Sequence, residues 1–205
     1  MAYILGYIYA DGNIAWDPKK GYQTVTITAA AKDKGHIENV REILSSTKPL
    51  LLGERTNSYR LIVNSKKLSK TLMKLGVKPR KSLTVRFPRV PEKYIRHFIR
   101  GVIDGDGTVR YLDRKRSPYF EIQISSGSRK FLKKMAKIVK QYIGIDARLR
   151  KSKGNTFILQ YSCSRGTKLA EWIYKDSKLR LERKFDQYKI AMDRKDIILG
   201  GGHGL

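Results

Sequence analysis

The sequence predicts an α+β fold made of two similar halves, each an α-β-β-α-β-β-α unit. A nine-residue motif occurs twice, at residues 4–12 and 99–107, about half a chain length apart. Each copy reads aliphatic, any residue, Gly, two mostly apolar residues, any residue, a small residue, Asp, Gly. The segments that follow the two copies also match each other, and 205 residues with 40% hydrophobic content suffice for a packed core. Such internal repetition predicts a duplicated architecture.

The first half is expected to follow its motif with a hairpin, a helix, a second hairpin and a short helix. An apolar-polar alternation predicts a strand, and apolar residues spaced by three or four positions predict a helix. The features in order are the motif at 4–12, a polar turn at 17–21, an alternating run at 22–29, an apolar helix face with Ile37, Val40, Ile43 and Leu44, a strand at 59–64, and a short helix with Leu68, Leu72 and Leu75.

The second half repeats this order. Its features are the motif at 99–107, a turn at 113–118, an alternating run at 119–125, a helix with Phe131, Met135, Ile138, Val139 and Tyr142 on one face, a strand at 156–161, and a short helix with Leu169, Trp172 and Ile173. Prolines at 88 and 91 mark a boundary, and Pro91 suits a first helical turn. The predicted domains are residues 1–90 and 91–205.

The charge predicts a polyanionic partner. Lys and Arg number 44 against 18 Asp and Glu, so the formal net charge is +26. Nucleic acid supplies dense phosphate charge and gains affinity from released counterions. A membrane surface is the competing partner, but the basic residues are scattered, and no apolar run approaches the roughly 20 residues that a spanning helix needs. No membrane association is therefore expected.

Cysteine usage and the first residues of the sequence bear on location. The single Cys163 excludes an internal disulfide, and no Cys/His cluster suggests zinc. No signal peptide pattern begins the sequence. A cytoplasmic location is expected, with organellar or nuclear expression left open.

The motif residues suit a helix pair that ends in two carboxylates. Gly6 and Gly101 remove side chains where two helices could approach closely. The glycines that follow Asp11 and Asp106 are expected to take positive φ and so end the helices. Two carboxylates facing one small space repel unless a cation lies between them. Hard oxygen ligands suit Mg²⁺, with Mn²⁺ or Ca²⁺ able to occupy the same place.

The two motif copies resemble those of the LAGLIDADG homing endonucleases, in the single-chain, two-motif branch. The matching residues are Gly6, Ala10, Asp11 and Gly12 in the first copy and Gly101, Asp104, Gly105, Asp106 and Gly107 in the second. The resemblance extends to about Arg194. It implies that the halves pack through the motif helices and that two antiparallel sheets form a DNA-binding saddle.

The resemblance also implies site residues. Asp11 and Asp106 would be catalytic and would bind the metal with the carbonyls of Ala10 and Gly105. Lys81 and Lys184 match a basic position just before the last helix of each half. Asp104 is left out, because its counterpart is Tyr9 and a role required in both halves cannot belong to it. A polar residue is expected at one strand end in each half; Ser125 or Ser126 supplies it in the second, whereas Ala29 or Ala30 departs from the pattern in the first.

Base recognition is expected from the open faces of the strands, where Gln and Asn suit adenine and Arg suits guanine in the major groove. Two sheets end to end would span on the order of 55 Å, or roughly 16 base pairs. The DNA-binding residues expected on these faces are Gln23, Thr24, Thr26, Thr28, Arg60, Asn64, Arg110, Glu121, Gln123, Ser125, Arg148 and Arg150.

The function expected from the resemblance is a monomeric, intron-encoded endonuclease that hydrolyses double-stranded DNA at a long site with Mg²⁺. Two alternatives stay open at this point. One is an RNA-splicing maturase that uses the basic surface on intron RNA. The other is a DNA-binding protein that keeps the fold without the chemistry.

Overall fold

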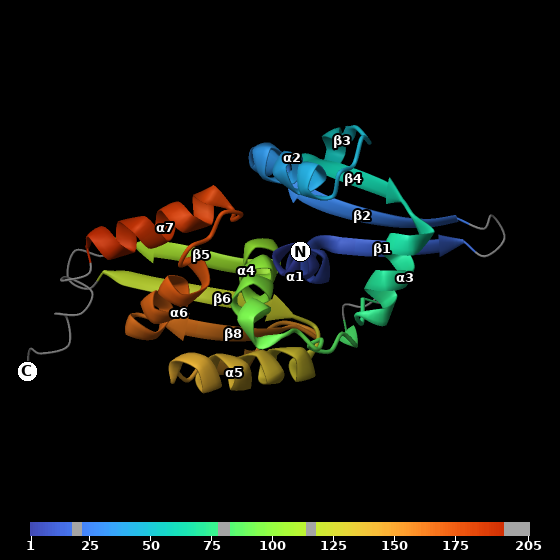
Figure 1. Ribbon diagram of the computed structural model, residues 1–205. Coiled ribbons are helices and arrows are strands. Elements are labelled where there is room, and N and C mark those ends of the chain that lie inside the picture. Colours follow the sequence, from blue (N-terminus) through green and yellow to red (C-terminus); the bar gives the residue numbers. More distant parts are fainter. Residues whose placement is uncertain (18–21, 78–82, 114–117, 195–205) are drawn as a thin grey trace, which may run out of the picture.

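The computed structural model describes residues 1–17, 22–77, 83–113 and 118–194. Two helices lie side by side at the centre, and a four-stranded sheet extends from them on either side (Figure 1). The predicted α+β fold with two pseudo-symmetric halves is confirmed. Lys81 lies outside the described residues.

The first half follows the predicted order of elements. Its sheet is antiparallel with the strand order β1-β2-β4-β3, and α2 and α3 pack against it. The elements are α1 (Ala2–Asp11), β1 (Gly12–Asp17), β2 (Tyr22–Ala30), α2 (Lys34–Ile43), β3 (Leu50–Gly53), β4 (Ser58–Asn64) and α3 (Lys66–Lys74), with short 3-10 turns at Ala31–Asp33 and Glu54–Thr56.

The second half repeats the order β5-β6-β8-β7 in its sheet and then adds one helix. The elements are a 3-10 turn (Glu92–Tyr94), α4 (Ile95–Asp106), β5 (Gly107–Leu112), β6 (Tyr119–Ser126), α5 (Arg129–Ile143), β7 (Arg148–Lys151), β8 (Phe157–Ser162), α6 (Ser164–Tyr174) and α7 (Glu182–Asp193). Helix α7 packs along the edge strand β5, where the Gln187 side chain accepts from the Tyr111 N–H at 3.0 Å.

Close contact between α1 and α4 depends on the two predicted glycines. A Cβ on Gly6 would overlap the carbonyl oxygen of Phe98, and one on Gly101 would lie 2.7 Å from the backbone nitrogen of Tyr7. Neither helix could accept a side chain at these points without moving away. The prediction that Gly6 and Gly101 permit close helix packing is confirmed.

The expected reason for Gly12 and Gly107 is wrong. Both have extended backbones, with φ of −91° and −92°, so neither uses the left-handed region. A Cβ on Gly12 would lie 2.5 Å from the carbonyl oxygen of Ile8, and Gly107 meets Ile103 in the same way. The chain leaves each helix straight into a strand, and glycine is needed because the turn folds tightly over the last helical turn.

Alternation along the strands separates a core face from an open face. In β2, Val25, Ile27 and Ala29 are buried, as are Ile122 and Ile124 in β6. Helices cover this side of each sheet. The residues between them therefore face the opposite, open side.

Candidate active site and nucleic-acid interface

Asp11 and Asp106 occupy the last positions of the two central helices. Asp11 is half-buried and Asp106 is exposed. The two helix ends are in contact: a Cβ on Gly105 would lie 3.1 Å from Oδ2 of Asp11 and would overlap the side chain of Ala10. The Asp11 carboxylate thus lies against the residue that precedes Asp106. The structure brings both motif aspartates to the same end of the helix pair.

A hollow of about 270 Å³ opens beside this end. Asp106 and Ala10 line it, together with Ser125 and Ser126 from the end of β6. The polar strand-end residues expected in the second half therefore line the same hollow as Asp106. The corresponding end of β2 has Ala29 and Ala30 instead, so the two sides of the site differ.

The donor set fits a hard divalent cation. Carboxylates and helix-end carbonyls are oxygen ligands, which Mg²⁺ prefers, and it retains several waters when protein ligands are few. Among the described residues there is no group of three or more His, Cys, Asp or Glu that could hold a metal alone. Asp11 and Asp106 with the carbonyls of Ala10 and Gly105 therefore suit Mg²⁺ shared with a substrate phosphate better than a fully protein-bound ion.

Lys184 lies within the first turn of α7, not before it as expected. Its side chain is 3% exposed, and Nζ donates to the carbonyl oxygens of Ile103 at 2.8 Å, Asp104 at 2.6 Å and Gly107 at 2.5 Å. These carbonyls end helix α4, where a cation is also favoured by the helix dipole. Burial lowers the pKa of Lys184 to about 8, although Asp104 opposes that effect. Lys184 therefore holds the backbone that carries Gly105 and Asp106.

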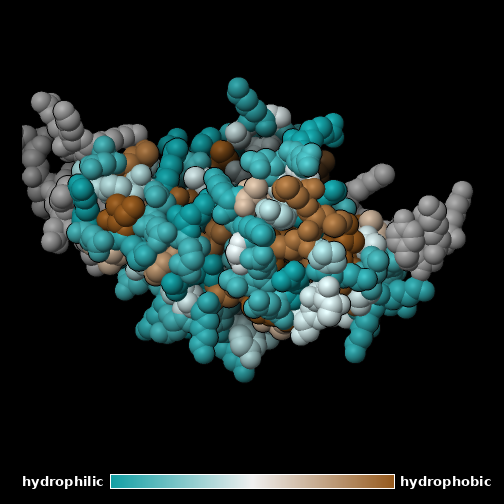
Figure 2. Space-filling model, turned by 90° about the horizontal axis from the view of Figure 1, so that it is seen from above, coloured by the Kyte–Doolittle hydropathy of each residue, from teal (hydrophilic) through white to brown (hydrophobic). Residues whose placement is uncertain are grey.

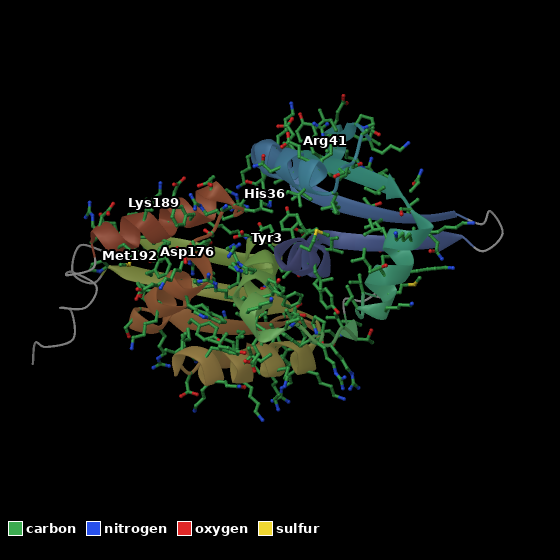
Figure 3. All side chains as sticks on the ribbon, viewed as in Figure 1. Tyr3, His36, Arg41, Asp176, Lys189 and Met192 are labelled. Atoms are coloured by element: carbon green, nitrogen blue, oxygen red, sulfur yellow. The ribbon has the colours of Figure 1, made fainter. Side chains whose placement is uncertain are left out.

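Asp104 belongs to a buried network between the halves. Its carboxylate accepts from the Tyr3 hydroxyl at 2.8 Å and from the Leu181 N–H at 2.9 Å. The Tyr3 hydroxyl also lies 3.0 Å from Nε2 of His36, and Figure 3 shows these two side chains together beside α1. Burial raises the pKa of Asp104 to about 6 and lowers that of His36 to about 4. These contacts give Asp104 a structural role between the two halves.

In the first sheet, most of the predicted DNA-binding residues share the open face. Register pairs Thr24 with Asn64 and Thr28 with Arg60, and Thr26 lies between them on β2. Gln23 is a correction. It shares the strand parity of Val25 and Ile27, and its Oε1 is buried without a hydrogen-bond partner. Gln23 therefore lies on the covered side of the sheet and is not placed to read bases.

In the second sheet, all six predicted residues lie on the open face. Arg110 of β5 pairs in register with Glu121 of β6. On the other side of β6, Gln123 pairs with Gln160 of β8, which in turn pairs with Arg148 of β7. Gln160 was not among the predicted residues, although its alternation with Leu159 and Tyr161 in the predicted strand was a usable signal. Further polar residues of the open face that were not predicted include Asn13, Thr108, Tyr119 and Ser162.

Glu121 differs from the other predicted readers, because it is only 1% exposed. It pairs with Arg110 and accepts from Nε2 of Gln123 at 2.9 Å and of Gln160 at 2.6 Å. Burial alone would raise the pKa of Glu121, but the hydrogen bonds from Gln123, Arg110 and Gln160 lower it overall. Glu121 stays ionised at neutral pH beneath its neighbours and cannot itself reach a base edge in this arrangement.

Hydrophilic residues cover most of the surface seen in Figure 2, and the larger apolar area lies over the N-terminal half. Exposed apolar side chains of that half include Ile43, Leu51 and Leu52. Within the described ranges, no helix is both long and apolar enough to cross a membrane.

The fold and site define a chain of two pseudo-symmetric halves whose paired helices end in adjacent aspartates beside two antiparallel sheets. Residues 93–183 match the family model of the LAGLIDADG-like domain. The whole chain has the pseudo-dimeric fold of the single-chain LAGLIDADG homing endonucleases.

Solved structures agree with this fold along nearly the whole chain. The meganuclease I-AabMI, bound to uncleaved DNA, has a TM-score of 0.67 and 13% identity and covers 97% of this chain and 94% of its own. A mesophilic variant of I-DmoI has a TM-score of 0.61 and 17% identity, covering 86% and 95%. I-LtrWI bound to its target DNA has a TM-score of 0.60 and 11% identity, covering 96% and 91%. At these identities the likeness shows the fold alone.

One curated relative is similar over part of the chain. A probable translation initiation factor IF-2 of Thermococcus kodakarensis is 31% identical over an alignment 114 residues long, which covers 52% of this chain. The chain spans 9% of the length of that protein.

Proposed function

We propose that this chain is a site-specific endonuclease that hydrolyses double-stranded DNA with Mg²⁺. The observation that carries the proposal is that Asp11 and Asp106 end two helices in contact, with the Asp11 carboxylate against Gly105. A pseudo-twofold arrangement suits a duplex, since its two strands present two scissile bonds. Both aspartates come from one chain, so the active form is proposed to be a monomer of the two units 1–90 and 91–205.

Asp11, Asp106 and the carbonyls of Ala10 and Gly105 would hold the metal. Mg²⁺ bound there would supply an activated water and charge neutralisation at the scissile phosphate. The protein's own contribution is to fix these oxygen atoms before the substrate arrives. The buried helix contact at Gly6 and Gly101 sets how closely the two aspartates approach each other.

Lys184 acts as a positioning residue. Its ammonium donates to the carbonyl oxygens of Ile103, Asp104 and Gly107 and lies 3.5 Å from that of Gly105, so it orients Asp106 through the backbone. It also adds positive charge that attracts the Asp11 carboxylate. Lys81 stays a prediction, as the matching basic residue of the first half.

The open faces of the two sheets would bind the duplex. Arg60, Asn64, Arg148 and Arg150 are exposed there, and a formal charge of +26 supplies non-specific attraction to phosphate. Specific contacts would come from the strands, because a two-stranded ribbon fits the major groove.

The test is cleavage of a random duplex library with Mg²⁺, followed by sequencing of the cut ends. Wild-type protein should enrich a long site, and Asp11→Asn and Asp106→Asn should each reduce cutting by at least about 100-fold. Retention of the same site by both variants in a gel-shift assay would place the loss in chemistry and not in binding.

Asp113→Asn is the matched control, because Asp113 is exposed and pairs with Arg194 far from the helix ends. It should cut as the wild type does. If Asp11→Asn and Asp106→Asn cut DNA as fast as the wild type does, the proposed chemistry would be refuted. Tight binding to structured intron RNA with no duplex cutting under any divalent ion would instead favour the maturase alternative.

A further inference from the structure

Glu121 is the centre of a polar cluster on the open face of the second sheet. Arg110, Tyr119, Gln123 and Gln160 all direct donors to its carboxylate. An acid that is 1% exposed yet lies on the proposed DNA-facing side needs an explanation. Its partners are the side chains best placed to contact bases, so the carboxylate's role is to orient them.

The chemistry of a carboxylate fixes which way the two amides point. An ionised carboxylate only accepts, so a glutamine beside it must turn its NH₂ group inward. Gln160 donates from Nε2 both to Glu121 at 2.6 Å and to the Tyr119 hydroxyl at 3.1 Å, which uses both of its hydrogens. Gln160 therefore has only its Oε1 acceptor left for other partners.

Gln123 is oriented in the same sense but less completely. Its Nε2 donates to Glu121 at 2.9 Å, which leaves one N–H and the Oε1 acceptor. Gln123 and Gln160 are direct register partners on neighbouring strands, so their side chains lie side by side on the open face. The sheet thus presents two adjacent acceptors.

Acceptors on a protein select bases that carry an exocyclic amino group in the major groove, which are adenine through N6 and cytosine through N4. We infer that Glu121 orients Gln123 and Gln160 so that this sheet reads adenine or cytosine on one strand at two neighbouring base pairs of one half-site. This inference rests on the proposed function. Gln123, with its remaining N–H, can pair with adenine at two points, whereas Gln160 accepts from either base.

The matching positions described in the first sheet form no equivalent cluster. Counting from the register pairs Gly12–Ile27 and Gly107–Ile124, the positions that match Glu121, Gln123 and Gln160 hold Thr24, Thr26 and Ile62. None of these can orient an amide through a carboxylate. The two half-sites are therefore read by different chemistry, and the target sequence is not a palindrome.

The experiment is selection of bound sequences from a random duplex library in metal-free buffer, which separates base reading from cleavage. On one strand of the aligned sites, wild type should favour adenine or cytosine over guanine or thymine by about fivefold or more at two neighbouring positions. Glu121→Gln keeps the shape but introduces an amide that can donate, so the two amides lose their fixed direction. Both preferences should fall to about twofold or less, with the other half-site unchanged.

Two further variants keep the result interpretable. Gln160→Met removes one acceptor and should abolish the preference at one of the two positions only. Thr24→Val changes the position that matches Glu121 in the first sheet and should alter only the opposite half-site. Thermal unfolding of each variant shows whether it is folded when it is assayed.

The outcomes separate this inference from the proposed function. Preference for guanine or thymine at the two positions, or preferences that Glu121→Gln leaves intact, would overturn the inference while duplex binding stands. Absence of any sequence enrichment would overturn the proposed function. In that case side-chain amide NMR decides the orientation: the Nε2 protons of Gln160 should exchange slowly in wild type and rapidly in Glu121→Gln, and equal exchange would refute it.

Discussion

Arg183 of the C-terminal half donates at two points to Asp33 of the N-terminal half, with Nε 2.8 Å from Oδ1 and Nη2 2.9 Å from Oδ2. The two residues are 150 positions apart in sequence. Asp33 is 7% exposed in its side chain, whereas Arg183 is 44% exposed. This parallel geometry fixes direction as well as distance, so the pair sets how the start of α7 lies against the first half.

Arg183→Met should lower the free energy of unfolding by roughly 1–3 kcal/mol, because it leaves a buried carboxylate without its partner. The partial exposure of Arg183 keeps the loss below that of a fully buried pair. Lys140→Met is the control, since Lys140 and Asp146 form a pair at the surface. It should change stability by no more than about 0.5 kcal/mol in urea unfolding. If both variants lost the same free energy of unfolding, the pair of Arg183 and Asp33 would contribute no more than an exposed ion pair does.

Gly6→Ala and Gly101→Ala should each destabilise the chain severely, by roughly 3 kcal/mol or more, because the added methyl would meet backbone of the facing helix. Gly35→Ala in α2 is the matched control, because a Cβ there has nothing within 4 Å. It should be neutral or stabilising by up to about 1 kcal/mol, since alanine favours a helix. Thermal unfolding compares the three. Tolerance of alanine at Gly6 would mean that the helices do not pack as closely as described.

Periodicity predicted the fold well, because each strand has one covered and one open face and each helix one buried stripe. The faces of β2 and β6 follow directly from Val25–Ile27 and Ile122–Ile124. Periodicity does not predict which side chains cover a residue on the open face. Glu121 has the alternation of a base reader, yet four neighbouring side chains bury it.

Contacts distant in sequence were also beyond prediction. The basic character of 183–184 was evident, but the partners of Lys184 lie 77 to 81 residues away, at a helix end whose backbone geometry the sequence does not specify. The same holds for Gly12, where the need for glycine comes from overlap with Ile8 and not from a positive φ. Sequence identified the residue types, and packing determined their roles.

His36 should make the chain less stable as the pH falls. Burial lowers its pKa from 6.5 to about 4, so between these values the unfolded chain binds a proton that the folded chain does not. The free energy of unfolding therefore rises with pH across this window, and it falls on acidification. His36→Phe should remove this contribution, so the wild type should lose roughly 2–3 kcal/mol relative to the variant from pH 6.5 to pH 4. Asp104 has a raised pKa and changes stability with pH in the opposite direction. Because Asp104 is present in both proteins, its contribution cancels in the difference between wild type and variant.

Binding to duplex DNA should depend steeply on salt. If about 6–10 phosphates are neutralised, affinity should fall by about 10³–10⁵ between 50 and 200 mM salt. Fluorescence anisotropy over a salt series measures the slope of log affinity against log salt concentration. Arg150→Ala removes an exposed cation from β7 and should reduce that slope by about one. A shallow slope in the wild type would contradict a phosphate-dominated interface.

Substitution of Lys184 distinguishes a positioning role from direct contact with a DNA phosphate. Lys184→Met leaves four carbonyl oxygens at the end of α4 without this donor, so stability should fall by roughly 2–4 kcal/mol and cleavage by about 100-fold or more. The salt slope of DNA binding should nevertheless stay as in wild type, because no phosphate contact is lost. Lys189→Met, at an exposed position of the same helix, should change stability by no more than about 0.5 kcal/mol. A slope reduced by one in Lys184→Met with stability unchanged would instead show that Lys184 reaches the DNA, and that its contacts with the helix end are replaced when the duplex binds.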